Sequence, residues 1–291
     1  MLRTAAIRTR QRVSERVHDG TTPHVVAGYL LCFMYVVVVV LPFYYVLVSA
    51  FKNNLEIFGA PLALPSQFSL YNFAHAEEVA CMSRAMAISF GVTVGSEIFT
   101  LVLAFPAAYA VARIRIGLAA WTELIFSLGF LIPPLAMLVP VYLTIARIGL
   151  LYNPLALVLF YPATKLSVSV LLLASYLRDV PIELEESAQI DGASRLQMIR
   201  YIFFPLARPG VITVLVLNFI DFWNEYLFAL VLLSSKNRTL QIALTILKSD
   251  RAVDYGMIAA GVLMAVIPVY LVFIFFQEQI TRGLYAGAVK G

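Results

Sequence analysis

Six stretches of predominantly apolar residues, each long enough to cross a lipid bilayer as a helix, constrain this chain more than any other feature. A crossing helix needs roughly 20 such residues, because the hydrocarbon core of a bilayer is about 30 Å thick. The stretches do not alternate apolar and polar residues as membrane strands do, which excludes an outer-membrane barrel. The predicted spans lie near residues 25–50, 85–112, 119–146, 153–176, 207–232 and 255–278.

The residue composition agrees with a protein that is embedded in a membrane. Of the 291 residues, 61% are hydrophobic and 13% are charged. Soluble domains carry about 25% charged residues, so a soluble fold is excluded. We therefore expect an all-α polytopic membrane protein with six transmembrane helices.

Basic residues are concentrated on one side of this predicted topology. Cytoplasmic loops carry an excess of Lys and Arg, so that side is predicted to be the cytoplasm and to hold both termini. The basic N-terminus is interpreted as a topology determinant rather than an arm that binds nucleic acid. The residues that set this orientation are Arg3, Arg8, Arg10, Arg12, Arg16, Arg113, Arg115, Arg178, Arg195, Arg200, Arg208, Arg282 and Lys290.

The chain divides into four predicted parts. Residues 1–24 form a cytoplasmic tail, and residues 25–83 form the first span with an extended external loop. A cleaved signal peptide is the alternative for residues 1–50, because Val48-Ser49-Ala50 resembles a cleavage site. Its apolar stretch, however, exceeds the roughly 7–15 residues of a signal core. Residues 84–278 form the transmembrane core, which includes the loop 179–205, and residues 279–291 form a second cytoplasmic tail.

The sequence offers no pattern for catalysis or metal binding. His18, His24 and His75 are scattered along the chain. Cys32 and Cys81 have neither zinc-site nor disulfide-framework spacing. No grouping of Ser, His and Asp or of Cys and His supports hydrolysis, so we expect no catalytic residues and no metal site.

A charged segment, residues 179–205, interrupts the apolar pattern between the fourth and fifth spans. Asp179 and Pro181 predict the start of a short helix, and Gly192 predicts its end through a backbone with positive φ. Ser194 followed by Gln197 is a capping box that predicts the start of a second helix. From these residues alone, a solvated connector and a docking element for another protein remain equally open.

The spacing within this segment resembles a known motif. Glu186-Ser187-Ala188, Gly192, Ile202 and Pro205 fit the pattern EAA-x3-G-x9-I-x-L-P. This pattern resembles the EAA loop of bacterial ABC importer permeases, with Ser187 in place of the second small residue and Phe204 in place of the usual Leu. The run Asp191-Gly192-Ala193 is similar to the form common in the carbohydrate branch of that family.

Three other segments extend the resemblance over nearly the whole chain. Residues 132–150 are similar to the third-span signature of carbohydrate permeases of the maltose type, specifically the smaller permease subunit. The run 223–226 resembles the family's W-N-[DE]-[FY], and residues 282–291 resemble its closing GLxAGAVKG. The likeness implies the type-I ABC importer permease fold and the import of a mono-, di- or oligosaccharide.

The resemblance also implies several partners: a second permease subunit, two cytoplasmic ATP-binding subunits and an extracytoplasmic sugar-binding protein. Independently, the sequence contains no G-x-x-x-x-G-K-[ST] phosphate loop, so energy must come from another polypeptide. We expect no cofactor and no enzymatic activity of the chain itself. Two alternatives remain: a polyol or glycerol-phosphate importer on the same scaffold, and a proton-coupled transporter that uses Asp221, Glu225 and Glu97.

Coupling to the ATPases is predicted to run through the charged segment. A short helix there would dock in a groove of the ATPase, with Leu184, Ala188 and Leu196 as an apolar face. Glu186, Asp191 and Arg195 would add contacts at the rim. The predicted coupling residues are Leu184, Glu186, Ser187, Ala188, Asp191, Gly192, Ala193 and Pro205.

Polar residues at membrane depth are the candidates for contact with substrate, because burying them in a bilayer is costly. Asn218, Asp221 and Glu225 stand at i, i+3 and i+7, which predicts one helical face. Interhelical pairing of Asp221 or Glu225 with Lys165 is the equally open alternative. The candidate pathway residues are Asn218, Asp221, Trp223, Asn224, Glu225 and Tyr226, whereas Glu97 is expected to form a structural hydrogen bond.

Overall fold

The computed structural model describes residues 23–113, 118–248 and 253–288, and every regular element within those ranges is helical. Within the same ranges, four helices are long and apolar enough to cross a membrane, and the number rises to six if each of two bent helix pairs is one span. The predicted all-α polytopic class is confirmed. The four long helices are α2 (Pro23–Ser49), α5 (Met82–Arg113), α8 (Leu155–Arg178) and α15 (Tyr255–Ala288).

The predicted span 119–146 is not one continuous helix. It consists of α6 (Leu118–Phe130), a 3₁₀ turn η1 (Pro134–Met137) and α7 (Leu138–Arg147), and its two halves meet at 90°. Pro133 has an extended backbone (φ −68°, ψ 126°) directly before Pro134. A residue that precedes a proline is pushed out of the helical region, so this proline pair breaks the span.

The predicted span 207–232 is also interrupted. Helix α12 (Arg208–Asn224) ends where Glu225 becomes extended (ψ 130°), and α13 (Leu227–Leu232) follows. At its other end α12 is bent by 76° from the preceding helical segment. That segment contains α10 (Arg195–Met198), the π-helical turn η2 (Ile199–Phe203) and α11 (Phe204–Leu206).

The loop 51–83 is more ordered than the extended segment expected from its prolines. It contains two helices, α3 (Asn54–Gly59) and α4 (Tyr71–Ala80). The side chain of Asn53 caps α3 by accepting a hydrogen bond of 3.0 Å from the N–H of Glu56. The remaining short helices are α9 (Ile182–Ile190) and α14 (Leu240–Ile246).

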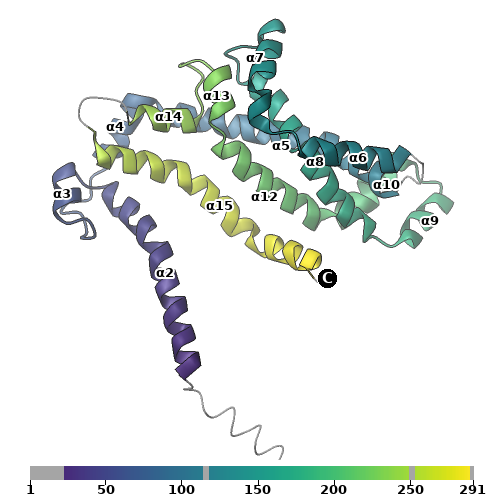
Figure 1. Cartoon of the computed structure of the whole chain (residues 1–291), viewed down its shortest axis with the longest axis horizontal. Coiled ribbons are helices and arrows are strands. Elements are labelled where there is room, and N and C mark those ends of the chain that lie inside the picture. Colours follow the sequence, from purple (N-terminus) through teal and green to yellow (C-terminus); the bar gives the residue numbers. More distant parts are fainter. Residues whose placement is uncertain (1–22, 114–117, 249–252, 289–291) are drawn as a thin grey trace, which may run out of the picture.

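Helices α5 and α8 pack against each other along much of their length and form the centre of the bundle. Ala104 and Ala108 of α5 and Ala174 of α8 are fully buried at this contact. Small side chains let two membrane helices approach closely, which gains van der Waals contact between their backbones. Helix α12 packs against both members of this pair, and α15 packs against α12 (Figure 1).

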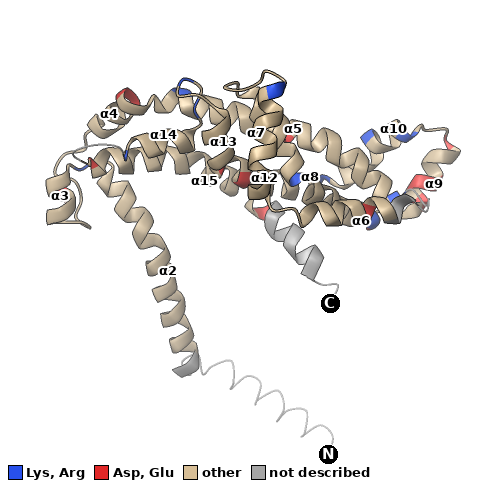
Figure 2. Cartoon of the chain, turned by 45° about the horizontal axis from the view of Figure 1, so that its top comes forward, with Lys and Arg blue, Asp and Glu red and all other residues tan. Residues whose placement is uncertain are grey.

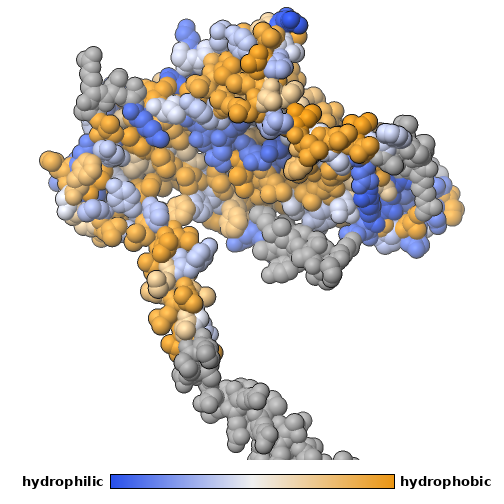
Figure 3. All heavy atoms as spheres, viewed as in Figure 1, coloured by the Kyte–Doolittle hydropathy of each residue, from blue (hydrophilic) through white to orange (hydrophobic). Residues whose placement is uncertain are grey.

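The bundle has two distinct ends (Figure 1). Helices α9 and α10 lie at one end, and α3, α4 and α14 lie at the other. Charged side chains are concentrated towards these ends, and the described part of α2 carries none (Figure 2). Hydrophobic residues cover much of the side of the molecule between them (Figure 3). This distribution suits a protein whose sides contact lipid.

Helix α2 diverges from the rest of the bundle (Figure 1). Only 6% of its most apolar 18-residue window is buried in the chain. Its C-terminal half packs against α15, where the rings of Phe43 and Tyr270 lie 5.5 Å apart. The first span therefore contacts the last one.

Candidate functional site

Residues 179–205 form an elbow at one end of the bundle, here called the acidic elbow, with α9 as its first arm and α10 as the start of its second (Figure 2). Helix α9 begins after Pro181, whose backbone is extended (ψ 137°). Glu183 and Glu185 lie in its first turn, where carboxylates stabilise the positive end of the helix dipole. Asp179 is not the helix start that the sequence suggested, because it caps the end of α8.

The bend of the acidic elbow depends on Gly192. This residue has φ +78°, and a Cβ placed there would meet no atom within 4 Å. The glycine is therefore required by its backbone conformation rather than by crowding. Beyond the bend, the predicted capping box is present: Ser194 N donates to Gln197 Oε1 at 2.7 Å, and Gln197 N donates to Ser194 Oγ at 3.4 Å.

Large apolar side chains lie exposed on the acidic elbow. Leu184 is 43% exposed, Ile190 87% and Leu196 75%. An exposed apolar cluster rimmed by polar residues is typical of a protein interaction surface. The predicted coupling residues that are also exposed are Glu186, Ser187, Asp191, Gly192 and Pro205.

Two predicted coupling residues face inward. Ala188 is only 8% exposed and packs into the core formed by α5, α8 and α12. Ala193 is half-buried against the same core. Ala188 therefore does not belong to the exposed apolar face on which the sequence analysis placed it, and Ile190 lies there instead.

A network of contacts centred on Arg113 fixes the acidic elbow to the bundle. Arg113 ends α5, and its guanidinium donates to the carbonyl oxygens of Leu177, at 2.6 Å, and of Val180. It also lies 3.9 Å from the carboxylate of Glu185 and 5.1 Å from the centre of the Phe203 ring. These contacts join the ends of α5 and α8 to α9 and η2.

Tyr109 adds to this network, because its hydroxyl donates to Glu185 Oε1 at 3.0 Å. Sequence reasoning counted Arg113 only as a topology signal and missed Tyr109 and Glu185. Tyr109 precedes Arg113 by one helical turn, and so shares its face of α5. Their common partner is 76 residues away from Tyr109 in the sequence, and periodicity carries no signal for such a pairing.

A second polar arrangement lies between α8 and α12 in the middle of the bundle. Asn218 donates to Ser169 Oγ at 3.1 Å, and Asp221 forms an ion pair with Lys165. Ser169, Lys165 and Tyr161 are spaced four residues apart, so they lie along one face of α8. The interhelical pairing considered for Lys165 is present.

Glu225 completes this arrangement, although it lies beyond the end of α12. Tyr161 donates to Glu225 Oε2 at 2.6 Å. The same carboxylate accepts the N–H groups of Phe228 at 2.8 Å and Ala229 at 3.1 Å, so it caps α13. Glu225 is the C-cap residue of α12, where the backbone leaves the helix (ψ 130°), and its carboxylate is held by α8 and α13 rather than by α12.

A cavity of about 290 Å³ adjoins the polar groups of α8 and α12. Its polar lining includes Lys165, Asp221 and Glu225, and its apolar lining includes Phe160 and Phe228. The side chain of Asp221 is 51% exposed and that of Lys165 is 29% exposed. The cavity also borders the helix breaks at residues 134–135 and 225–227, and broken helices in membranes are tolerated where they line a cavity.

The other predicted pathway residues lie away from this cavity. Trp223 is 1% exposed, and its indole N–H donates to the carbonyl of Ala265 in α15 at 3.0 Å. Asn218 is 3% exposed. Asn224 accepts a hydrogen bond from Gln241 at 3.3 Å. Tyr226 is exposed and does not line the cavity. Only Asp221 and Glu225 of the predicted pathway residues therefore adjoin it.

Glu97 is a buried carboxylate in the middle of α5. It is 6% exposed and lies beside Asn218, whose amide donates to Ser169. Asn218 interacts with the Glu97 carboxyl group, but among the described residues no contact to either of its oxygens has full hydrogen-bond geometry. Glu97 lines a separate, largely apolar cavity of about 340 Å³ between α5, α12 and α15.

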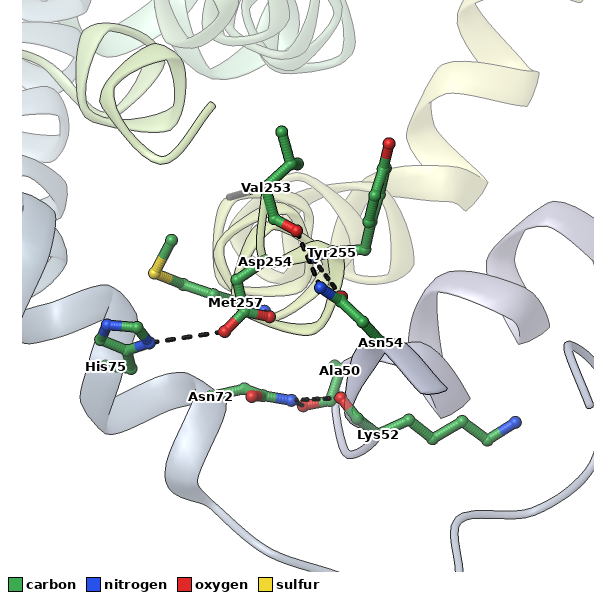
Figure 4. A network of polar contacts seen from close by, with 9 residues as sticks. All are labelled: Ala50, Lys52, Asn54, Asn72, His75, Val253, Asp254, Tyr255 and Met257. Carbon is green, nitrogen blue, oxygen red and sulfur yellow. Dashed lines mark hydrogen bonds and ion pairs between the residues drawn. The ribbon is translucent and has the colours of Figure 1, made fainter. Parts of the chain in front are cut away.

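A polar network at the end opposite the acidic elbow fastens the loop after α2 to the start of α15 (Figure 4). Asn54 donates to the carbonyl of Val253 at 2.8 Å and accepts from the N–H of Tyr255 at 2.9 Å. His75 Nδ1 lies 3.5 Å from Asp254 Oδ2. In the described part of the chain, no group of three or more His, Cys, Asp and Glu residues could hold a metal ion. His18 lies outside that part.

Asn72 contributes the remaining bonds of this network. Its side-chain amide donates to the carbonyls of Ala50 and Lys52, each at 2.9 Å (Figure 4). Gly256 lies against the same carbonyl, because a Cβ on it would come within 2.2 Å of Lys52 O. The approach of the two backbones therefore requires glycine at this position.

Comparison with known proteins gives matches over most of the chain. Residues 101–284 match the family model described as binding-protein-dependent transport system inner membrane component. The diacetylchitobiose uptake system permease protein DasC of Streptomyces coelicolor is 31% identical, over 87% of this chain and 92% of that protein. The melibiose/raffinose/stachyose import permease protein MelC of Bacillus subtilis is 30% identical, over 86% of this chain and 91% of that protein.

A solved structure has the same fold. It is the crystal structure of a bacterial ABC transporter involved in the import of the acidic polysaccharide alginate. One of its chains superposes with a TM-score of 0.78 and 22% sequence identity, and the match covers 87% of this chain and 95% of that one. The overall helical arrangement described above is thus a fold that a bacterial ABC importer also has.

Proposed function

Because the chain belongs to the family of binding-protein-dependent transport system inner membrane components, we propose that it is the transmembrane permease subunit of an importer for a sugar. Relatives at 30–31% identity are named for the uptake of diacetylchitobiose and of melibiose, raffinose and stachyose, which supports a mono-, di- or oligosaccharide as cargo. The subunit pairs with a second permease, receives sugar from an extracytoplasmic binding protein and draws energy from two separate ATP-binding subunits. It lies in the bacterial cytoplasmic membrane with both termini in the cytoplasm.

The observation that carries this proposal is the exposed surface of the acidic elbow. Leu184 and Ile190 of α9 and Leu196 of α10 offer apolar side chains outside the bundle, and Glu186 and Asp191 add exposed charges. A short helix of this kind docks in a groove on a partner by burying its apolar residues. The sequence contains no phosphate loop of its own, and this supports an ATPase as the partner.

Coupling follows from the way in which the acidic elbow is attached. Arg113 and Tyr109 hold Glu185 of α9 to the end of α5, and Arg113 also holds the C-terminal carbonyls of α8. When the ATPases close on ATP, a docked α9 moves with them. The contacts to α5 and α8 then pass the displacement to the centre of the bundle, and alternating access is the result.

The sugar pathway is proposed to pass the cavity between α8 and α12. Asp221, Glu225 and Lys165 supply acceptors and donors for sugar hydroxyls, and Phe160 and Phe228 supply apolar surface for the ring faces. The ion pair of Lys165 with Asp221 keeps two charges neutralised at membrane depth when no sugar is present. Trp223 and Asn218 then have a structural role, because both are buried.

The decisive experiment is transport by the reconstituted complex of both permeases, the ATP-binding subunits and the binding protein in liposomes. Uptake of labelled sugar is expected to need both ATP and the binding protein and to be unaffected by a protonophore. Uptake that persists without nucleotide and collapses with the protonophore would establish a proton-coupled transporter instead. Competition by polyols or glycerol phosphates tests whether one of these is the cargo.

A further inference from the structure

Three cationic side chains surround a pocket of about 250 Å³ at the end of the bundle opposite the acidic elbow. Arg84 lies in the first turn of α5, and Lys236 and Arg238 lie in the segment between α13 and α14. These three residues are here called the cationic pocket. Cys81 and Ser235 also line it.

Among the described residues, no acidic side chain lines the cationic pocket. In the part of the chain that the structure describes, none of its three cations forms an ion pair. Glu77, which is close to Arg84 in the sequence, accepts the N–H of Ser83 at 2.7 Å and the Ser83 hydroxyl at 2.7 Å. Within the described ranges, the three positive charges are thus concentrated without a partner in an ion pair.

Electrostatic repulsion disfavours this concentration of charge within the fold. Arg84 stands at the N-terminal end of α5, where the helix dipole is positive and opposes a cation. Lys236 and Arg238 are separated by a single residue and repel each other and Arg84 across the pocket. Binding of a negatively charged partner explains the three clustered cations better than the folding of the chain does.

The cationic pocket is held in shape before any partner arrives. Arg84 donates to Asn237 Oδ1 at 3.4 Å, and Asn237 Nδ2 donates to the carbonyl of Tyr152 at 3.0 Å. The N–H of Leu240 donates to Ser89 Oγ at 2.8 Å, which fixes the far end of the same segment to α5. A segment that is held at two points loses little conformational entropy on binding.

We propose that the cationic pocket is a docking site for acidic side chains on the extracytoplasmic binding protein. This inference rests on the proposed function, in which the end opposite the acidic elbow faces the outside. A lipid phosphate would bring acyl chains that need an apolar slot, whereas Ile88 is the one large apolar residue among the described lining residues. A protein surface needs no such slot, and complementary charge would steer its approach.

The test uses the complete complex in nanodiscs of phosphatidylcholine, with the binding protein that supports sugar uptake by the wild-type complex. Stimulation of ATP hydrolysis is measured against the concentration of that binding protein. The double variant Arg84→Glu/Lys236→Glu is expected to raise the concentration for half-maximal stimulation at least about tenfold and to leave basal hydrolysis unchanged. Raising salt should weaken stimulation of the wild type more than that of the double variant.

The matched control is Arg147→Glu, the same charge change on an exposed residue at the end of α7 that does not line the pocket. It is expected to leave stimulation within about twofold of the wild type, since the charge of a single exposed residue contributes little. Lys substitutions of acidic residues on the docking lobes of the binding protein should restore stimulation of the double variant. Unchanged stimulation of the double variant overturns the docking site. A defect that appears only in anionic lipid assigns the pocket to a lipid headgroup.

Cys81 gives a second readout that depends neither on a mutation in the pocket nor on activity. Its thiol is exposed and lines the pocket, and Cys32→Ser removes the other cysteine of the chain. A membrane-impermeant maleimide should label Cys81 from outside the cell, and a saturating amount of binding protein should slow that labelling at least about threefold by covering the pocket. Labelling from the cytoplasmic side alone would refute the proposed topology. Labelling from outside at a rate that the binding protein leaves unchanged would refute the docking site alone.

Discussion

Arg113 at the end of α5 lies 3.9 Å from Glu185 in the first turn of α9, so one ion pair links the centre of the bundle to the acidic elbow. Both side chains are largely buried, at 8% and 13% exposed. The pair between Arg178 and Glu123 has a shorter distance of 2.7 Å, but its side chains are 46% and 42% exposed. Breaking the buried pair is therefore expected to cost more stability than breaking the exposed pair, although the exposed pair has the shorter distance.

Arg113→Gln is therefore expected to be strongly destabilising. It leaves the Glu185 carboxylate buried without a cation, which costs about 3–5 kcal/mol when a buried pair is broken. Thermal unfolding of the purified complex measures this as a lower melting temperature, together with loss of sugar-stimulated ATP hydrolysis. Arg178→Gln is the control, and a loss of at most about 1 kcal/mol is expected from its exposed pair. Equal effects of the two variants would contradict the role given to Arg113.

Gly192→Ala is expected to impair coupling more than insertion in the membrane. A side chain at φ +78° costs about 1–2 kcal/mol, so the bend between α9 and α10 shifts towards other geometries. Co-purification of the ATP-binding subunits and stimulated ATP hydrolysis should both fall. Gly91→Ala in α5 also has open space around its Cβ and should have little effect. Full stimulation in Gly192→Ala would argue against the elbow as the coupling element.

Exchange of the charges in the α8–α12 ion pair separates structure from transport. Lys165→Asp alone places two carboxylates together, and a reduced amount of folded protein in the membrane is expected. The exchange variant Lys165→Asp/Asp221→Lys restores the pair and should restore the protein amount. Sugar uptake is expected to stay at least about tenfold below the wild type, because donors and acceptors in the cavity are interchanged. Full recovery of uptake would make the pair purely structural.

Trp223→Phe tests whether this buried indole acts through packing or through sugar. The substitution removes the bond from the buried indole to the Ala265 carbonyl, at an expected cost of about 0.5–1.5 kcal/mol for one lost hydrogen bond. The melting temperature should fall while the sugar concentration for half-maximal uptake stays unchanged. A raised half-maximal concentration at unchanged stability would place Trp223 in the sugar pathway.

Gly256→Ala should loosen the attachment of α15 to the segment after α2. The new Cβ would lie 2.2 Å from the carbonyl of Lys52, so the backbones must separate and the bonds of Asn72 are strained. Less folded protein and faster proteolysis after residue 50 are expected. Gly28→Ala within α2 meets no atom within 4 Å and serves as the control. Equal proteolysis of both variants would show that the close approach is unimportant.

Local signals in the sequence predicted local structure well. The capping box at Ser194 and the positive φ at Gly192 are present because each depends on residues within one helical turn. The apolar spans identified the membrane class, although the prolines at 133 and 134 broke one of them. The apolar pattern predicted one span over residues 119–146, whereas the structure turns there by 90°.

Contacts between distant segments explain what the sequence did not predict. Spacing placed Trp223 and Asn218 in the fifth span but did not show that α15 and α8 cover them. Glu225 was placed on a helix by its spacing from Asn218 and Asp221, yet its carboxylate caps α13 and accepts from the hydroxyl of Tyr161. Arg113 carried no recognisable signal, because its partners follow it by 64 residues or more.

The contact between α2 and α15 has a consequence for biosynthesis. Translation delivers Phe43 to the membrane well before Tyr270 exists, so the N-terminal helix must wait, solvated by lipid, until the final span has been inserted. In a nascent chain that ends before α15, α2 has no helix to pack against. Membrane quality control would then recognise α2 as an unassembled helix.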